Sequence, residues 1–167
     1  MPLPRLLVLL ILLLAATARA DEATEVQRLM RAGELPAALE RAERASAADP
    51  GDAKLRFLNG VILMDLQRDA AALAVFERLT EDFPELAEPY NNIALLQARA
   101  GRLDEARAAL ETALRNDPSL RAARSNLGDV YLRLAMRTWE SVAAEAPGDA
   151  GLQRRLRAAR EIIAQPR

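Results

Sequence analysis

Cysteine and histidine are both absent from this 167-residue sequence. Their absence excludes disulfide bonds, thiolate nucleophiles, the usual zinc sites and the commonest general base at neutral pH. Aromatic residues make up only 4% of the chain, whereas 51% of it is hydrophobic and rich in alanine and leucine. Such a composition favours helix at nearly every position. We therefore expect an all-α protein with one ordinary core.

An excess of charge of one sign is also lacking, because 23 basic residues face 24 acidic ones. Nucleic acid is therefore not expected as a partner. The sequence has no glycine-rich phosphate loop and no metal-ligand spacing, so we expect no cofactor. Glu81, Asp82 and Glu85 lie close in sequence, but no partner base accompanies them. These absences predict a protein that is not an enzyme.

The first twenty residues have the pattern of a secretory signal. A short positive start, Met1 to Arg5, precedes the continuously apolar run from Leu6 to Ala16, and Ala18-Arg19-Ala20 fits a signal peptidase site. This run of 11 residues is shorter than the roughly 20 residues that span a bilayer as helix. We expect residues 1–20 to be cleaved and residues 21–167 to form an exported domain, periplasmic or secreted, without stable membrane insertion. A retained membrane anchor is the alternative.

Proline recurs at a fixed interval along the chain. Pro50, Pro84 and Pro118 are each separated by 34 positions, an interval typical of solenoids built from helix pairs. If each proline is numbered position 32 of its unit, Gly33 and Gly101 both stand at position 15. Glycine at that place is expected to end the first helix of a pair in the left-handed conformation.

Small and large residues occupy complementary positions in these units. Position 24 holds Phe76 and Leu110, two large apolar residues that would fill the space left by small ones. The small residues stand at position 8 (Gly60, Ala94, Gly128) and at position 20 (Ala38, Ala72, Ala106).

This pattern resembles the tetratricopeptide repeat. The second unit departs from the family pattern at Asn59, where an apolar residue is usual, and at Gln67, which replaces the turn glycine. The resemblance implies an all-α, right-handed superhelical solenoid of antiparallel helix pairs. The third unit matches best, at Tyr90, Ile93, Ala94, Gly101, Ala106, Leu110, Ala113 and Pro118. The repeats would span approximately residues 22–50, 51–84, 85–118 and, in degenerate form, 119–147.

The fourth unit is shorter than the others. Its Pro147-Gly148-Asp149-Ala150 repeats Pro50-Gly51-Asp52-Ala53 at a separation of 97 residues, where three full periods would give 102. The hairpin turn therefore lacks five residues, and neither glycine nor proline occurs from Asp129 to Ala146. We expect the two helices to fuse into one long helix. Trp139, which stands eight residues before Pro147 as a position-24 residue would, is expected in the core.

The segment over residues 149–165 is expected to form an amphipathic capping helix that ends the solenoid. Its arginines are expected on other faces of the helix, and solvation is favoured over docking on an anionic surface. The apolar stripe consists of Leu152, Leu156, Ala159 and Ile163.

The resemblance also implies a concave groove lined by the first helix of each pair. Asparagine at position 6, occupied by Asn92 and Asn126, commonly hydrogen-bonds a ligand backbone in this family. Arg99 and Arg133 could bind a carboxylate in bidentate fashion. The alternative is that the asparagines tie neighbouring helices together and the arginines are solvated. The predicted groove comprises Asn91, Asn92, Leu95, Arg99, Ser125, Asn126, Asp129 and Arg133.

In the second unit the corresponding wall is apolar. Phe57, Val61 and Met64 share one helical face. This face predicts a pocket for an apolar ligand side chain, and the favoured alternative is a stripe of the core.

Together these features favour a scaffold or adaptor that binds an extended peptide or a protein partner in the cell envelope. The alternative is a structural component of a larger envelope complex, which would use the solenoid ends or the long fourth helix. A third class, an envelope hydrolase, has no supporting residues.

Overall fold

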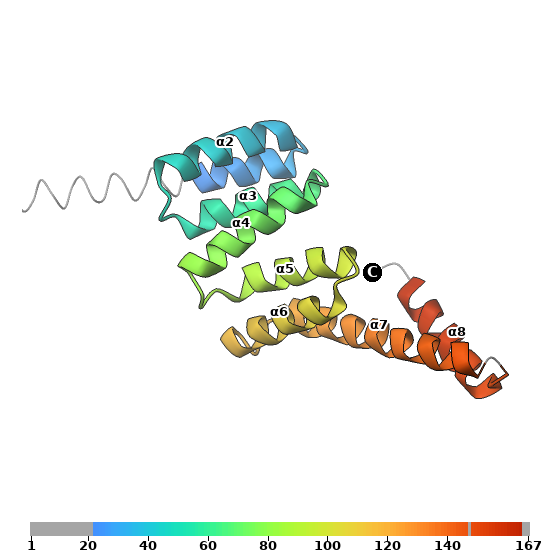
Figure 1. Ribbon diagram of the computed structural model, residues 1–167. Helices are drawn as coiled ribbons and strands as arrows, with labels where there is room; N and C mark the ends of the chain where they lie inside the picture. The colour runs from blue at the N-terminus through green and yellow to red at the C-terminus, as the bar shows by residue number, and fades with distance from the viewer. Residues whose placement is uncertain (1–21, 147, 165–167) are drawn as a thin grey trace, which may run out of the picture. The chain divides into compact units, whose positions relative to one another are not determined.

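A computed structural model of the chain describes residues 22–146 and 148–164, so the expected signal at residues 1–20 lies outside the described residues. Those residues form eight helices and no strand, which confirms the expected all-α class (Figure 1). None of the described helices has the length and hydropathy of a membrane span. The first helix covers residues 22–31. The others are α2 (Leu35–Ala48), α3 (Ala53–Asp65), α4 (Asp69–Asp82), α5 (Ala87–Arg99), α6 (Leu103–Asn116), α7 (Arg121–Glu145) and α8 (Ala150–Ala164).

The helices group into two compact units that meet in sequence at Pro84 and Glu85. Unit 1 contains the helix over residues 22–31 together with α2, α3 and α4, and unit 2 contains α5 to α8. Within unit 2, α5 packs against α6 and α7, and α7 packs against α6 and α8. Short connections between neighbouring helices favour antiparallel pairs, as the repeat pattern predicts.

Three tight turns close the helix pairs with the same backbone hydrogen bonds. In the second pair the N–H of Arg68 donates to the carbonyl of Leu63 at 2.8 Å, and in the third the N–H of Arg102 donates to Gln97 at 2.9 Å. The residue just before the donor has a left-handed backbone in both turns, with φ of 58° at Gln67 and 76° at Gly101. Gln67 therefore adopts the geometry of the missing glycine, at the steric cost that a Cβ brings there.

The repeated Pro-Gly-Asp-Ala sequence starts two helices in the same way. The side chain of Asp52 accepts a hydrogen bond from the N–H of Leu55 at 3.0 Å, and that of Asp149 accepts one from Leu152 at 3.0 Å. Each carboxylate satisfies a backbone donor that the first turn of a helix leaves without a partner. An aspartate thus caps the start of both α3 and α8.

The expected match of small and large residues is confirmed in the second repeat. Phe76 of α4 is fully buried, and a Cβ on Gly60 of α3 would lie only 2.5 Å from its Cε1 atom. The absence of a side chain at Gly60 is therefore what lets α3 and α4 approach this closely. In unit 2, Leu110 and Ala94 occupy the equivalent positions in one buried cluster.

The fourth unit forms one continuous helix, α7, as the missing residues predict. No hairpin turn brings a large residue back over Gly128, and a Cβ there would meet nothing within 4 Å among the described atoms. The expectation that Trp139 lies in the core is wrong. Without a hairpin turn this residue stays on the uninterrupted helix α7, where its side chain is only partly buried.

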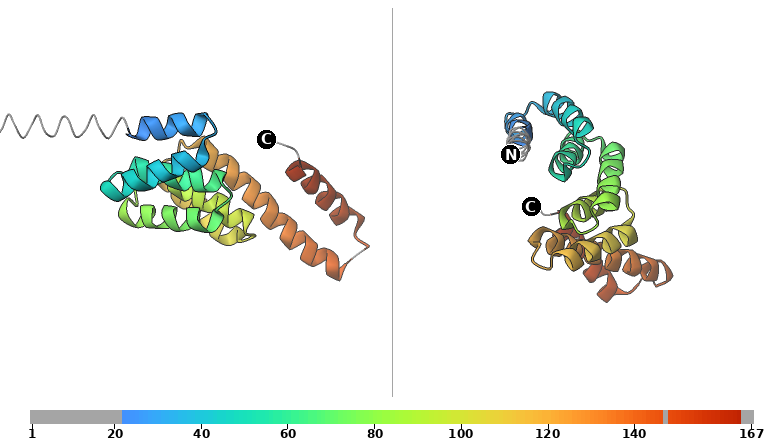
Figure 2. Two further views of the ribbon diagram at one scale, coloured as in Figure 1. Left: turned by 90° about the horizontal axis from the view of Figure 1, so that it is seen from above. Right: turned by 90° about the vertical axis from the view of Figure 1, so that its left-hand side faces the viewer.

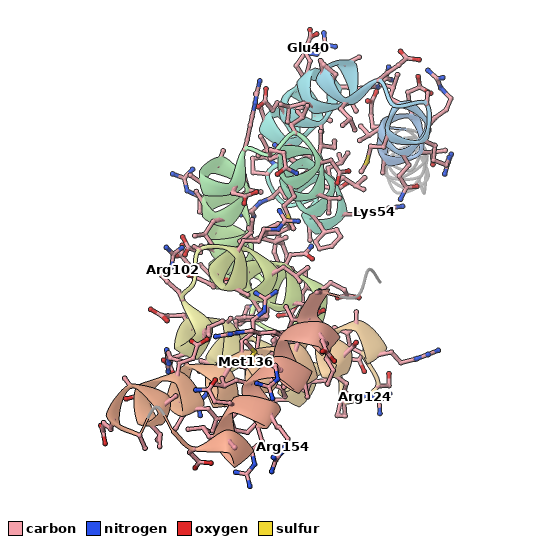
Figure 3. The ribbon with its side chains drawn as sticks, turned by 90° about the vertical axis from the view of Figure 1, so that its right-hand side faces the viewer. Glu40, Lys54, Arg102, Arg124, Met136 and Arg154 are labelled. Carbon is pink, nitrogen blue, oxygen red and sulfur yellow. The ribbon has the colours of Figure 1, made fainter. Side chains whose placement is uncertain are left out.

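Helix α8 turns back along α7 (Figure 2). It buries Leu152, Leu156 and Ala159, as the amphipathic pattern predicts. Arg160 of α8 also forms an ion pair with Glu140 of α7 at 2.9 Å. The arginines of α8 are exposed, and Arg154 extends away from the helix in Figure 3. The expected C-terminal capping helix is confirmed.

Gly60→Ala and Gly128→Ala should have opposite effects, although both residues hold position 8 of their repeats. The alanine at 60 must displace the buried Phe76 ring, which we expect to lower the free energy of unfolding by about 1–3 kcal/mol. The alanine at 128 meets no neighbour and should raise it by roughly 0.5–1 kcal/mol, because alanine favours helix over glycine. Urea unfolding followed by circular dichroism measures both; equal effects would contradict the packing described for these helices.

Candidate functional site

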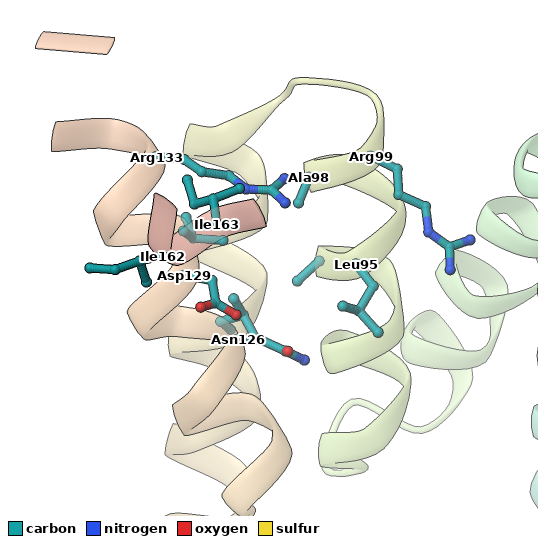
Figure 4. A pocket seen from close by; sticks show the side chains of 11 residues that line it. Leu95, Ala98, Arg99, Asn126, Asp129, Arg133, Ile162 and Ile163 are labelled. Carbon is teal, nitrogen blue, oxygen red and sulfur yellow. The ribbon is translucent and has the colours of Figure 1, made fainter. Parts of the chain in front are cut away.

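A pocket of about 390 Å³ lies in unit 2 between α5, α7 and the end of α8 (Figure 4). We call it the α5–α7 pocket. Ala94 and Ala98 of α5 and Val130 of α7 form part of its apolar lining. Five of the eight predicted groove residues also line it, namely Leu95, Arg99, Asn126, Asp129 and Arg133.

The other three predicted groove residues do not line this pocket. Asn91 of α5 is buried, with 8% of its surface exposed, where α5 packs against α7. Asn92 is partly buried on α5, and Ser125 is exposed on α7. The structure therefore gathers five of the eight predicted residues around one opening, and a ligand groove there stays a prediction.

A chain of amide hydrogen bonds connects α7 to α5 beside the pocket. Asn126 Nδ2 donates to Asn91 Oδ1 at 2.8 Å, and Asn91 Nδ2 donates to Asn92 Oδ1 at 3.4 Å. The first bond joins residues of neighbouring repeats. It fits the alternative interpretation, in which Asn126 connects two helices. It also fixes the orientation of the Asn126 amide at the pocket wall, so both roles are compatible.

The two predicted arginines extend in different directions. In Figure 4, Arg133 reaches from α7 toward α5 at Ala98, whereas Arg99 extends away from α7. Among the residues that the structure describes, the Arg133 side chain has no ion-pair or hydrogen-bond partner. A guanidinium in this state carries five donors that suit a carboxylate.

Helix α8 supplies two pocket residues that the sequence analysis did not assign to the site, Ile162 and Ile163. A helix of 15 residues is about 22 Å long, so α8 reaches back along α7 as far as Val130 and Arg133. Two features of the sequence could have indicated these residues, namely the fused helix and the turn after it. Together they place α8 back along α7.

The three residues of the predicted apolar pocket lie on α3 in unit 1. Met64 is buried, and the ring of Phe57 packs on that of Phe76 with centroids 5.7 Å apart. Val61 is partly buried. Two of the three are thus engaged with the core of unit 1, in line with the core-stripe alternative, and a ligand pocket there stays a prediction.

In the described part of the chain, no group of three or more acidic, histidine or cysteine side chains is placed to hold a metal ion. In unit 1 a second pocket, of about 470 Å³, includes Glu22 and Arg41 in its lining. These two form an ion pair at 2.8 Å.

Comparisons with known proteins all indicate the same family. The profile of the tetratricopeptide repeat matches residues 23–87 and 91–150. The TPR repeat-containing thioredoxin TTL4 of Arabidopsis thaliana is 33% identical over 113 residues, which cover 65% of this chain and 17% of that protein. The chain therefore spans only a small part of this relative.

Two solved structures share the fold at low identity. One is the first tetratricopeptide domain of Spaghetti (RPAP3) bound to the HSP90 peptide SRMEEVD, with a TM-score of 0.66, 17% identity and coverage of 70% of this chain and 93% of that one. The other is the Yersinia enterocolitica type III secretion chaperone SycD in complex with a peptide of the translocator YopD. Its TM-score is 0.63 at 13% identity, covering 68% of this chain and 92% of that one.

Asn126→Ala should destabilise the chain more than Asn92→Ala. The first change removes the donor to Asn91 and leaves a buried carbonyl oxygen without it, which costs about 1–3 kcal/mol, whereas the second removes only a long hydrogen bond of 3.4 Å. Urea unfolding of both variants measures the difference.

The double variant Asn91→Ala/Asn126→Ala is the control for the hydrogen bond between these two residues. It should lose less stability than the sum of the losses caused by Asn91→Ala alone and Asn126→Ala alone, because the two residues share one hydrogen bond. Additive losses would show that the bond contributes nothing to stability.

Proposed function

Because the chain belongs to the tetratricopeptide repeat family, we propose that it is a scaffold that binds an extended segment of another protein in the α5–α7 pocket. The fold is typically an interaction module and not a catalyst, and the proposal assigns the chain no reaction. Two proteins of similar fold bind peptides, from HSP90 and from YopD respectively. That likeness supports the class of ligand, and the residues of this chain must supply its details.

The observation that carries the proposal is the state of Arg133. Its side chain crosses the pocket from α7 toward α5 and is partly buried, yet it has no polar partner among the described residues. A carboxylate on a bound segment would provide the missing partner and would form the stronger, charge-assisted kind of hydrogen bond. The pocket is thus suited to a segment that carries an acidic group.

Charge reversal at Arg133 tests the proposal. Short random peptides displayed on phage are selected on the purified chain, and the enriched peptides are labelled and titrated by fluorescence anisotropy. Arg133→Glu should weaken their binding about tenfold or more, because an attraction to a carboxylate becomes a repulsion. The matched control is Arg155→Glu, which makes the same charge change on an exposed face of α8 outside the pocket. Equal affinities of these two variants, or no enriched peptide, would contradict the proposal.

A structural role in a larger complex is the second candidate function. It is favoured by Tyr131, an aromatic side chain on α7 that is 48% exposed. An assembly component would bind a folded partner through this part of α7, so that Tyr131→Glu would weaken the association and Arg133→Glu would not. The two functions therefore separate by which of the two variants loses binding.

We further propose that the protein is exported and works in the cell envelope. The support is the positive start, the apolar run from Leu6 to Ala16 and the small residues around Arg19. Expression of the full chain in a bacterium with two membranes should release a periplasmic form whose first residue, by N-terminal sequencing, is Asp21. A product that retains Met1 in the cytoplasm would contradict this location.

A further inference from the structure

The last turn of α8 forms an apolar wall of the α5–α7 pocket. Ile162 lines the pocket and is 56% exposed. Ile163 lies beside it and is partly buried. Across the pocket, Leu95 and Ala98 of α5 present apolar surface as well. An apolar group between these two walls would remove surface of both from water.

The rest of α8 holds this wall in place. Leu152, Leu156 and Ala159 are almost completely buried, with 6%, 2% and 3% of their surfaces exposed. The ion pair between Arg160 and Glu140 fixes the next turn. Only the residues after this ion pair extend along the pocket, so the wall is attached to a packed helix.

Helix α8 borders the pocket without filling it. About 390 Å³ remain open between α5, α7 and α8, near the lower end of the roughly 300–1,000 Å³ typical of ligand pockets. Such a space can hold a large side chain of a peptide. An intramolecular plug would instead leave Ile162 buried and the space closed.

We propose that the α5–α7 pocket holds one bulky aliphatic or aromatic anchor side chain of the bound segment, against Ile162, with an acidic group next to the anchor at Arg133. This inference rests on the proposed peptide-binding function. It assigns α8 to the binding site, beyond its role as a cap. The anchor supplies affinity through burial of apolar surface, and the acidic group sets the position of the segment.

A double-mutant cycle between peptide and protein tests the anchor. In each peptide enriched by the phage selection, every apolar residue is replaced singly by alanine, and the peptides are titrated against the unaltered chain and Ile162→Ser. One apolar position should cost about tenfold in affinity with the unaltered chain. Ile162→Ser should bind the parent peptide about fivefold more weakly, and the penalty for replacing the anchor should shrink against it.

Val142→Ser is the matched control, because it removes a similarly exposed aliphatic side chain from α7 outside the pocket. It should leave both the affinity and the anchor penalty unchanged. Circular dichroism and thermal melting establish that both variants remain folded, which the exposure of both side chains leads us to expect.

Three results would overturn the inference while the proposed function stands. They are peptide affinities that are insensitive to every apolar replacement, an anchor penalty that is equal with and without Ile162, and tighter binding to Ile162→Ser. The last would show that α8 competes with the peptide. Failure of the proposed function gives a different result, because then no peptide is enriched or Arg133→Glu binds as well as Arg155→Glu.

Discussion

The close approach of paired helices is the constraint on which this structure depends. In the second repeat, Phe76 occupies the space that a side chain at Gly60 would need, and in the third repeat Leu110 packs with Ala94 in the same manner. Each pair leaves one face of its first helix outside this contact. Helix α7 follows at the same interval and packs against α5 and α6, although no second helix covers its Gly128, so α5 and α7 come to border one pocket. The pocket is thus a consequence of how the helices pack.

The loss of five residues in the fourth unit changes the partner of its first helix. A complete repeat would fold a second helix back over Gly128, but α7 continues to Glu145 and leaves that residue without a neighbour. Helix α8 then returns along α7 and brings Ile162 to the pocket. A deletion that looks like decay of the repeat pattern therefore gives the pocket a wall that a regular hairpin would not place there.

Much of the fold could be predicted from the sequence, because local chemistry determines it. Proline spacing, turn residues and the small and large positions act within one repeat, and the geometry is robust enough for Gln67 to adopt the turn of a glycine. The site depends on contacts between elements distant in sequence. Family position placed both Asn91 and Asn92 in the groove and gave the ligand contact to Asn92, yet it is Asn91 that bonds to Asn126. Only the packing of α5 against α7 distinguishes these neighbouring asparagines.

Polar and apolar parts of the α5–α7 pocket have different physical tasks. Asn126 is already held by Asn91, so its hydrogen bond contributes order to the wall before any ligand arrives. Arg133 is not held in this way by any described side chain. Its guanidinium is therefore available to an acidic group of a bound segment. Ile162 likewise keeps more than half of its surface in water. Within the proposed site, Asn126 thus orders the wall, and two other side chains, one charged and one apolar, are left for contact with the bound segment.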